Sequence, residues 1–524
     1  MALHQSLQRS TACSEGDNEV VAQMPIKKLP LLSLVYFAIV VCFCLSFVFG
    51  AFILTVEPDE VWNLMSTMKA LGIPLPPTSA VDKPITTTGG LHFVLHGLIA
   101  LWRSGDILAH RLASIGVTLV LLIVVFKLIE RHVKDRVLAA AGTALFVTAP
   151  GFLLQASLAT SEIIATTIFL LASLFWVRSG TQSLSMALLG GTLFGLACAT
   201  RMTCLSMLPA ILVWSAIAHR GWIARFVYPL MAITAAVLVF AGCVGMYVYA
   251  FGDTPWSKFL VATGLSSGIG VPFPGVMLRL NYLTVANGII PTAAIVALVG
   301  WFASRLELQK ESDQDITRLC GFLLLAGSAG WLSWVLKAPI SHIRYLWPAI
   351  PLLWLTAVLL GVSALGRVLR MKTAMIGHLT IILICATQGL LNVRMLAVGD
   401  SLELVYETAR QSSLGIPQNI FTARKDQEAM ASLVAALPPS ATIHALMEPA
   451  AYPITYLSSR TVRSFRQPMQ TAGENYLLVL PTDYSVWLPN WDAIGWLQVN
   501  TTLVERRGKY ALYRVHGSSQ PPSQ

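Results

Sequence analysis

The sequence Val48-Phe-Gly-Ala-Phe-Ile-Leu-Thr-Val-Glu-Pro-Asp-Glu60 joins the end of a long apolar run to three carboxylates within four residues. The apolar run begins at Leu29 and is longer than a signal-peptide core of about 7–15 residues, so we expect an uncleaved membrane span. Carboxylates next to hydrocarbon are costly and are usually retained for a function. The boundary between Val56 and Glu57 therefore predicts both a membrane fold and a functional site at its surface.

The composition extends the membrane prediction to most of the chain. Of 524 residues, 55% are hydrophobic and 12% are charged, whereas soluble proteins average about 25% charged residues. The net charge of +10 does not indicate nucleic-acid binding, because the excess lies in short loops between apolar runs and the segment from Asp400 onward is neutral. All eight cysteines precede residue 387, and their spacing predicts neither a disulfide framework nor a metal site.

The apolar runs predict about eleven transmembrane helices, given that a span needs roughly 20 residues. They lie at about 31–54, 107–129, 137–154, 163–178, 183–200, 203–218, 226–250, 284–303, 319–337, 345–364 and 373–391. Lys and Arg occupy alternate loops, for example at Lys27, Arg131 and Arg305, and the positive-inside rule assigns these loops to the cytosol. The N-terminus is then cytosolic and the C-terminus extracytoplasmic.

The predicted fold class is an all-α polytopic membrane protein of about 11 transmembrane helices with a small extracytoplasmic α/β C-terminal domain. The predicted parts are a cytosolic disordered tail at 1–28, a transmembrane domain at 29–392 with outer loops 55–106 and 251–283, the α/β domain at 393–516, and a polar tail at 517–524.

Local patterns predict several elements outside the spans. In the first outer loop they are a surface helix from Glu60 to Leu71 and an apolar stretch, His92 to Trp102, that is too short to span. In the C-terminal domain they are a helix and strands at Asp426–Leu437, Thr442–Met447, Val462–Phe465 and Tyr476–Leu480, followed by a hairpin that turns at Gly508.

Acidic and basic residues from different spans gather at the predicted outer face. They are Glu57, Asp59, Glu60, Asp82, Lys83, Arg103, Asp106, Arg111, Glu162, Arg201, Lys337, His342 and Arg344. A carboxylate can take a proton from an attacking hydroxyl, and Lys and Arg can neutralise a departing phosphate. At a membrane face the natural donor is a lipid phosphate. This mixture therefore favours group transfer from a phosphate-linked lipid.

The order of these residues resembles the GT-C glycosyltransferase superfamily. Glu57-Pro-Asp-Glu60 is similar to its ExD or DE signature, and Asp82-Lys83-Pro84 resembles the acid-Lys-Pro motif of aminoarabinose lipid A transferases and protein O-mannosyltransferases. Later segments match in the same order, namely Ala159-Thr-Ser-Glu162, Gly195-Leu-Ala-Cys-Ala-Thr-Arg201 and His342-Ile-Arg-Tyr-Leu-Trp-Pro348-Ala-Ile-Pro351. The chain departs from the lipid A enzymes after Pro84, where Ile85-Thr-Thr-Thr-Gly-Gly90 follows. The acceptor and the donor sugar therefore stay open.

The resemblance implies a role for each matching residue. Asp59 would be the catalytic base, and the phosphate of the donor would be bound by Lys83, Arg201 and Arg344. Substrate-positioning roles would fall to Glu57, Glu60, Asp82, Glu162, His342 and Tyr345. No cofactor is required by the enzymes with the Asp-Lys-Pro motif, whereas other GT-C enzymes hold a divalent metal with these acids, here Glu57 and Asp59.

The same residues also have purely structural explanations. The acidic cluster can cap a helix N-terminus, a role that is compatible with catalysis. Lys83 can snorkel toward the surface, and Arg344 beside Tyr345 can be an interfacial anchor. Glu162 can be a loop carboxylate, Arg201 can form a structural ion pair, and His342 can be a structural histidine. The residues expected to flank a span or pair locally are Arg103, Asp106 and Arg111.

The sequence thus predicts a membrane glycosyltransferase that moves a sugar, with inversion, from a polyprenyl-phosphate donor to a hydroxyl acceptor on the extracytoplasmic face. Its expected partners are the lipid-linked sugar, membrane lipid, and a glycan, lipid or protein acceptor, and nucleic acid is not among them. A bacterial inner membrane is favoured over the endoplasmic reticulum. The alternative is a flippase or transporter of lipid-linked sugars, which would need charges or broken helices at mid-membrane.

Overall fold

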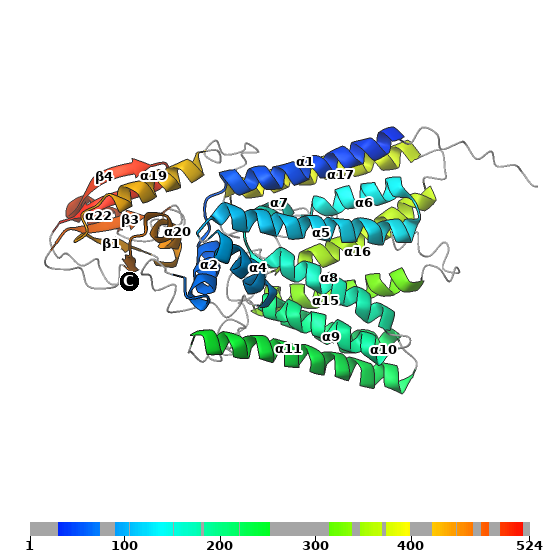
Figure 1. Ribbon diagram of the computed structural model, residues 1–524. Coiled ribbons are helices and arrows are strands. Elements are labelled where there is room, and N and C mark those ends of the chain that lie inside the picture. The colour runs from blue at the N-terminus through cyan, green and yellow to red at the C-terminus, as the bar shows by residue number, and fades with distance from the viewer. Residues whose placement is uncertain are drawn as a thin grey trace, which may run out of the picture.

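The computed structural model describes residues 30–73, 90–103, 105–149, 151–179, 183–218, 221–251, 314–337, 346–368, 374–398, 422–446, 448–464, 473–480 and 493–516. The predicted tails, nearly all of the loop 251–283 and the apolar run 284–303 lie outside these ranges. The described residues form a helical part, up to α17, and a small C-terminal part that contains a sheet (Figure 1).

The helices of the first part run side by side in Figure 1, apart from the shorter α2 and α4. In chain order they are α1 Pro30–Ile53, α2 Pro58–Ala70, α4 Gly90–Trp102, α5 Ile107–Val133, α6 Arg136–Val147, α7 Phe152–Ser157, α8 Ser161–Ser179, α9 Leu184–Thr200, the 3-10 helix η1 Met202–Met207, α10 Pro209–Ala218, the π-helix η2 Ile223–Val227, α11 Tyr228–Phe251, α15 Gln314–Lys337, α16 Ala349–Val368 and α17 Ala374–Val398. The surface helix predicted from Glu60 to Leu71 is present as α2.

Some of these helices meet the requirements for a membrane span. Among the described residues, the stretches that are long and apolar enough are Leu31–Ile53, Ile107–Val133, Ile223–Met246 and Met375–Val393. Other apolar helices are shorter, and α4, with 13 residues, is too short to span, as predicted. The fold class is confirmed as a mostly helical protein with a small C-terminal sheet, whereas the count of about eleven spans stays a prediction.

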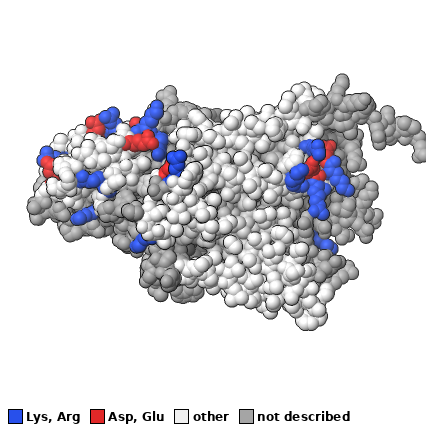
Figure 2. All heavy atoms as spheres, viewed as in Figure 1, with Lys and Arg blue, Asp and Glu red and all other residues white. Residues whose placement is uncertain are grey.

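Charged side chains lie at the two ends of the molecule in Figure 2, and a broad band without them separates the two groups. Helix α5 connects the two ends: Arg111 lies near its start, and near its end Glu130 pairs with Lys127 at 2.7 Å and with Arg136 at 3.0 Å. Large apolar side chains such as Phe37 and Leu238 are more than 60% exposed between the ends. An uncharged, apolar girdle is the surface that a bilayer core requires.

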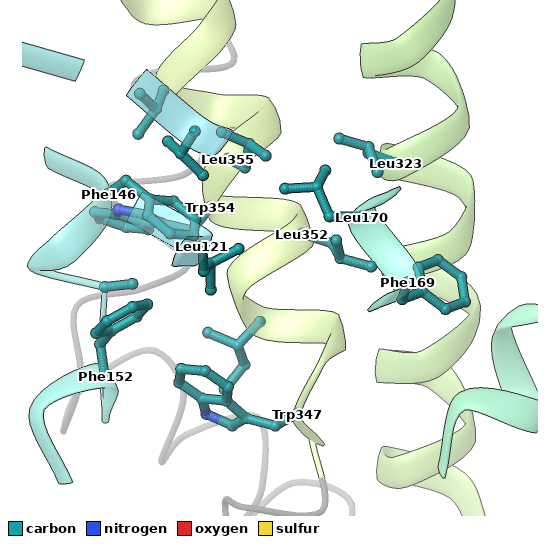
Figure 3. Packing of buried hydrophobic residues seen from close by; sticks show 14 of the residues in the cluster. Leu121, Phe146, Phe152, Phe169, Leu170, Leu323, Trp347, Leu352, Trp354 and Leu355 are labelled. Carbon is teal, nitrogen blue, oxygen red and sulfur yellow. The ribbon is translucent and has the colours of Figure 1, made fainter. Parts of the chain in front are cut away.

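Large side chains from several helices fill the interior of the helical part (Figure 3). The ring of Phe152 on α7 lies 5.7 Å from that of Trp347, and the indole of Trp354 on α16 donates to the carbonyl of Leu145 at 2.7 Å. Small residues bring α9 and α11 together, because a Cβ on Gly191 would collide with the backbone of Ala232. This packing fixes the ends of the helices that carry the predicted site residues.

The C-terminal part is a sheet with helices on both faces. Its described strands have the order β2-β1-β3-β5-β4, with β1 parallel to β2 and β3, and β5 antiparallel to β3 and β4. The elements are α19 Ala423–Ala435, β1 Thr442–Ala445, α20 Glu448–Ser458, β2 Val462–Ser464, β3 Asn475–Val479, α22 Ala493–Asn500, β4 Thr501–Arg507 and β5 Tyr510–Val515. The strands lie where the sequence predicts them, and the hairpin turns at Gly508, where φ is 55°.

Alternating burial explains why the sheet is covered twice. Leu478 and Leu512 pack with α19 and α20 in one apolar cluster, whereas Leu477 and Ala511 pack with α22 in another. The helices α20 and α22 were not predicted from the sequence. Helix α20 matters for the site, because it packs against α2 of the helical part.

Candidate active site

The acidic cluster forms the first turn of α2. Glu57 is the N-cap residue, Pro58 begins the helix, and Asp59 and Glu60 follow within the first turn. The backbone N–H of Glu57 donates to Oε2 of Glu60 at 3.0 Å, as part of a capping box. The capping alternative is therefore confirmed for Glu57 and Glu60, and the capped turn places the half-buried Asp59 between them.

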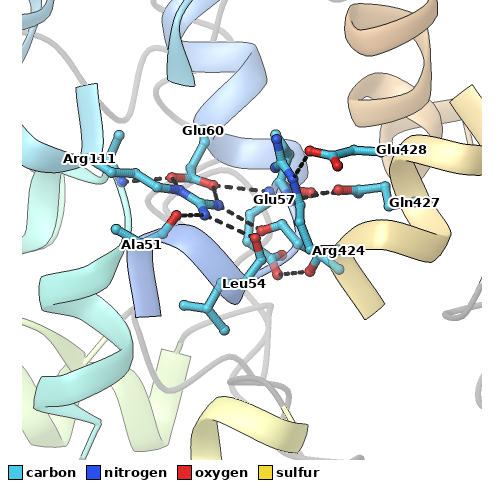
Figure 4. A network of polar contacts seen from close by, with 11 residues as sticks. Ala51, Leu54, Glu57, Glu60, Arg111, Arg424, Gln427 and Glu428 are labelled. Carbon is cyan, nitrogen blue, oxygen red and sulfur yellow. Dashed lines mark hydrogen bonds and ion pairs between the residues drawn. The ribbon is translucent and has the colours of Figure 1, made fainter. Parts of the chain in front are cut away.

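Glu60 forms a buried ion pair with Arg111 of α5 (Figure 4). Nε of Arg111 donates to Oε1 of Glu60 at 2.9 Å, and a terminal nitrogen donates to Oε2 at 2.6 Å. The remaining donors of the guanidinium reach the carbonyl oxygens of Ala51, Leu54 and Thr55 at 2.9, 3.0 and 2.7 Å. All five donors of this Arg are thus used, on the turn that ends α1 and precedes α2.

This network corrects the expectation for Arg111. The sequence placed it among residues that flank a span or pair locally, whereas its partner lies 51 residues away on another helix. Both side chains have 0% exposure, and a buried charge of this kind needs a well-oriented partner. Glu60 therefore holds the motif in place, and its two oxygens are occupied by protein donors.

The same carboxylate connects the motif to the segment before α8. Oε1 of Glu60 accepts a hydrogen bond of 2.7 Å from the backbone N–H of Ala159. Glu162, the second predicted acidic position, lies three residues further on, in the first turn of α8. The structure thus brings these two predicted acidic positions to the same end of the helical part.

Glu162 pairs in turn with Arg201, which ends α9. The distance between a terminal nitrogen of Arg201 and Oε1 of Glu162 is 3.0 Å, and both side chains are almost fully buried. The other oxygen of Glu162, Oε2, has no hydrogen-bond partner among the described residues. The predicted structural ion pair therefore exists, and it leaves acceptor capacity on Glu162.

Two further segments are anchored beside Arg201. The backbone N–H of Leu91 donates to Oγ1 of Thr200 at 3.2 Å, and Oγ1 of Thr203 donates to the carbonyl of Trp347 at 2.9 Å. Gly90 has φ of 51°, and a Cβ there would lie 3.0 Å from the backbone of Thr200. The chain thus enters α4 and approaches α16 next to the end of α9.

The other predicted residues lie outside the described part of the chain. They are Asp82, Lys83, His342, Arg344 and Tyr345. Of the predicted residues that are described, the structure brings together Glu57, Asp59, Glu60, Glu162 and Arg201. Arg103 is exposed, and Asp106 caps α5 by accepting from the N–H groups of Leu108 and Ala109.

Three buried histidines near this site were missed by the sequence reasoning. Nδ1 of His96 lies 2.9 Å from Nδ1 of His110, and the rings of His92 and His96 have centroids 4.2 Å apart. Burial, followed by the charges of His110 and Arg201, lowers the pKa of His92 to about 3. The spacing of His92 and His96 by four residues in an apolar segment was the available signal, because it places both on one helix face.

The described residues do not by themselves supply a metal site. Among the described residues, no group of three or more His, Cys, Asp or Glu side chains is placed to hold a metal ion. Glu57 and Asp59 would therefore need ligands from elsewhere in the chain or from substrate. Metal dependence stays a prediction.

Comparison with known proteins finds solved structures with a similar fold. No protein-family model matches the chain, and no curated protein matches its sequence. The crystal structure of ArnT from Cupriavidus metallidurans bound to undecaprenyl phosphate has a TM-score of 0.58 with this chain, at 13% identity, over 93% of this chain and 99% of ArnT. The chain has the GT-C fold.

The apo structure of the same ArnT gives a TM-score of 0.55 at 11% identity, over 94% of this chain and 99% of ArnT. Both matches cover the C-terminal part as well as the helices, as their coverage shows. The resemblance to GT-C proteins drawn from the sequence is thus confirmed for the fold.

Proposed function

We propose that this chain is a membrane glycosyltransferase that uses a polyprenyl-phosphate-linked sugar. The observation that carries the proposal is the geometry of the first turn of α2, in which one carboxylate holds the turn beside another. Glu60 is saturated by Arg111, Glu57 and Ala159 and holds this turn, and the half-buried Asp59 beside it occupies the position that the resemblance gives to the catalytic base. The fold shared with ArnT, which binds undecaprenyl phosphate in its crystal structure, supports a donor of this class.

The proposed reaction is a single displacement at the anomeric carbon. Asp59 accepts the proton of the acceptor hydroxyl while that oxygen forms a bond to the anomeric carbon from the side opposite the phosphate. The bond between the anomeric carbon and the phosphate oxygen breaks, and its electron pair stays on the phosphate. The product sugar therefore has the inverted configuration, and no covalent enzyme intermediate forms.

Arg201 is proposed to bind the departing phosphate, together with Lys83 and Arg344. A cation aimed at the oxygen on which charge develops stabilises the transition state more than the ground state. Lys83 and Arg344 are included because they match the basic positions of the resemblance. The remaining predicted residues, Asp82, His342 and Tyr345, are proposed to position substrate with Glu162.

The test is transfer of labelled sugar from polyprenyl-phosphate donors by the purified chain. The variant Asp59→Asn should reduce kcat by about 10²–10⁴-fold, the usual contribution of a general base. Asp135→Asn is the matched control, because Asp135 caps α6 at the opposite end of α5 and should leave transfer within about twofold. Full activity of Asp59→Asn would contradict the assignment of Asp59 as the base.

The proposed mechanism needs no cofactor, since basic side chains supply the positive charge. A divalent metal held by Glu57 and Asp59 is the alternative. Dialysis against EDTA separates the two: unchanged transfer is expected, and loss of transfer that Mg²⁺ or Mn²⁺ restores would establish the metal-dependent mechanism instead.

A further inference from the structure

A side chain of the C-terminal part forms hydrogen bonds with the backbone immediately before the acidic cluster. Gln427 of α19 accepts from the N–H of Val56 at 2.8 Å and donates from Nε2 to the carbonyl of Val56 at 3.0 Å. Gln427 and Val56 are each only 2% exposed. The side-chain amide thus satisfies both backbone groups of Val56, which directly precedes Glu57, the N-cap of α2. Figure 4 shows Gln427 pointing toward the segment that contains Glu57.

The surroundings of Gln427 are buried. Tyr510 of β5 is 6% exposed, and burial, followed by the charge of Glu57, raises the pKa of its hydroxyl. On the next turns of α2, the ring of Trp62 meets that of Tyr452 from α20 edge to face, with centroids 5.6 Å apart. Val56 and Tyr452 belong to one buried apolar cluster with residues of α2.

The first turn of α2 is therefore held from two sides. From the helical part, Arg111 binds Glu60 and the carbonyls of Leu54 and Thr55. From the C-terminal part, Gln427 binds the next residue, Val56. Loss of the second anchor would leave a buried N–H and C=O unpaired and would release one side of the turn on which Asp59 sits.

We propose that Gln427 is a positioning residue that couples docking of the C-terminal part to the placement of Asp59. This inference rests on the proposed function, because it gives Gln427 a role in that reaction. A misplacement of about 1 Å in a reacting group can lower a rate by about 10²-fold. A purely structural contact would instead change only the stability of the folded chain.

The experiment compares Gln427→Met with Glu428→Gln in the full-length chain. Gln427→Met keeps the approximate volume and removes both hydrogen bonds. Glu428→Gln is the control, because Glu428 is the next residue on α19 and pairs with Arg424 at the surface. For each variant the measurements are kcat and KM for a labelled polyprenyl-phosphate sugar, and hydrogen exchange of the segment 55–62 without substrate.

The expected result for Gln427→Met is a fall in kcat of about 10- to 100-fold, with KM for the donor within about twofold and faster exchange in 55–62. Glu428→Gln should match the native chain in all three. Unchanged exchange in Gln427→Met, or faster exchange with an unchanged kcat, would overturn the inference.

The exchange measurement distinguishes failure of this inference from failure of the proposed function. If the native chain transfers no sugar from any polyprenyl-phosphate donor, the proposed function is overturned, and with it the role of Gln427 in that reaction. If the native chain is active and Gln427→Met behaves as Glu428→Gln does, only the inference is overturned.

Discussion

The two buried Arg–carboxylate pairs at the α2 end of the helical part differ in how completely they are satisfied. In the pair of Glu60 and Arg111, every guanidinium donor and both carboxylate oxygens have protein partners. In the pair of Glu162 and Arg201, Oε2 of Glu162 has no hydrogen-bond partner among the described residues. The first pair is built to hold a turn, whereas the second retains capacity for a further group.

This difference separates charged residues that stabilise the fold from charged residues that can bind substrate. A buried ion pair repays its desolvation only when the remaining lone pairs and protons are also satisfied, as they are around Arg111. A buried carboxylate oxygen without a partner is a cost that structure alone does not explain. The Arg111 pair therefore holds the turn, and we propose that the Arg201 pair contributes to substrate binding.

The largest expected effect is on stability, in the variant Arg111→Lys. Lys has three donors and no planar fork, so it cannot make the bidentate pair with Glu60 and also bind three carbonyl oxygens. At least two of the five buried acceptors lose their donor, and each such loss costs about 1–3 kcal/mol, so we expect the free energy of unfolding to fall by about 2–6 kcal/mol. Denaturation of the chain in detergent measures this change in stability. A loss below about 1 kcal/mol would contradict the structural role of the Glu60–Arg111 pair.

The matched variant Arg201→Lys should have the opposite profile. Lys retains the charge that faces Glu162 and loses the fork that would bind two phosphate oxygens. We expect transfer to fall by about 10- to 100-fold while the unfolding midpoint stays within a few degrees of the native value. A large loss of stability with normal activity per folded molecule would show that this pair is also structural.

A smaller effect concerns pH and the histidines that lie near Arg201. His92 has a pKa of about 3 in the folded chain, against an ordinary value of 6.5, because of burial and then of His110 and Arg201. Between these values the unfolded chain binds more protons than the folded chain, so stability decreases as pH falls from about 6.5 toward 3. The slope from one such group is at most about 1.4 kcal/mol per pH unit.

The variant His92→Gln should flatten this pH dependence, as measured by thermal denaturation between pH 7 and pH 4.5. His516→Gln, which changes an exposed histidine of the C-terminal part, is the control and should keep the native slope. An equal slope in His92→Gln and the native chain would show that His92 does not contribute.

The sequence predicts the elements better than the contacts between them. Helix α2 and the hairpin at Gly508 follow from local signals, such as Pro58 at a helix start and a Gly with positive φ at a turn. The grouping of Glu60, Glu162 and Arg201 at one face was predicted from the topology, and the resemblance added the order of their motifs in the chain. Nothing in the local pattern distinguishes Glu60 from Asp59.

The remaining contacts depend on packing between distant segments. The partner of Arg111 is 51 residues away, and that of Gln427 is 371 residues away, so neither pair leaves a periodic signal in the sequence. Arg111 did carry one general signal, since a charge just inside a long apolar run needs a partner. For Gln427 the sequence holds no comparable cue, because a polar residue on an amphipathic helix is ordinary.

The most direct test of the account compares Asp59→Asn with Glu60→Gln in one preparation scheme, with unfolding and sugar transfer measured on each. We predict that Asp59→Asn keeps the native unfolding midpoint and loses transfer, whereas Glu60→Gln lowers the midpoint strongly because Arg111 loses its charged partner. Sugar transfer by Asp59→Asn at the native rate, or native stability of Glu60→Gln, would contradict these roles.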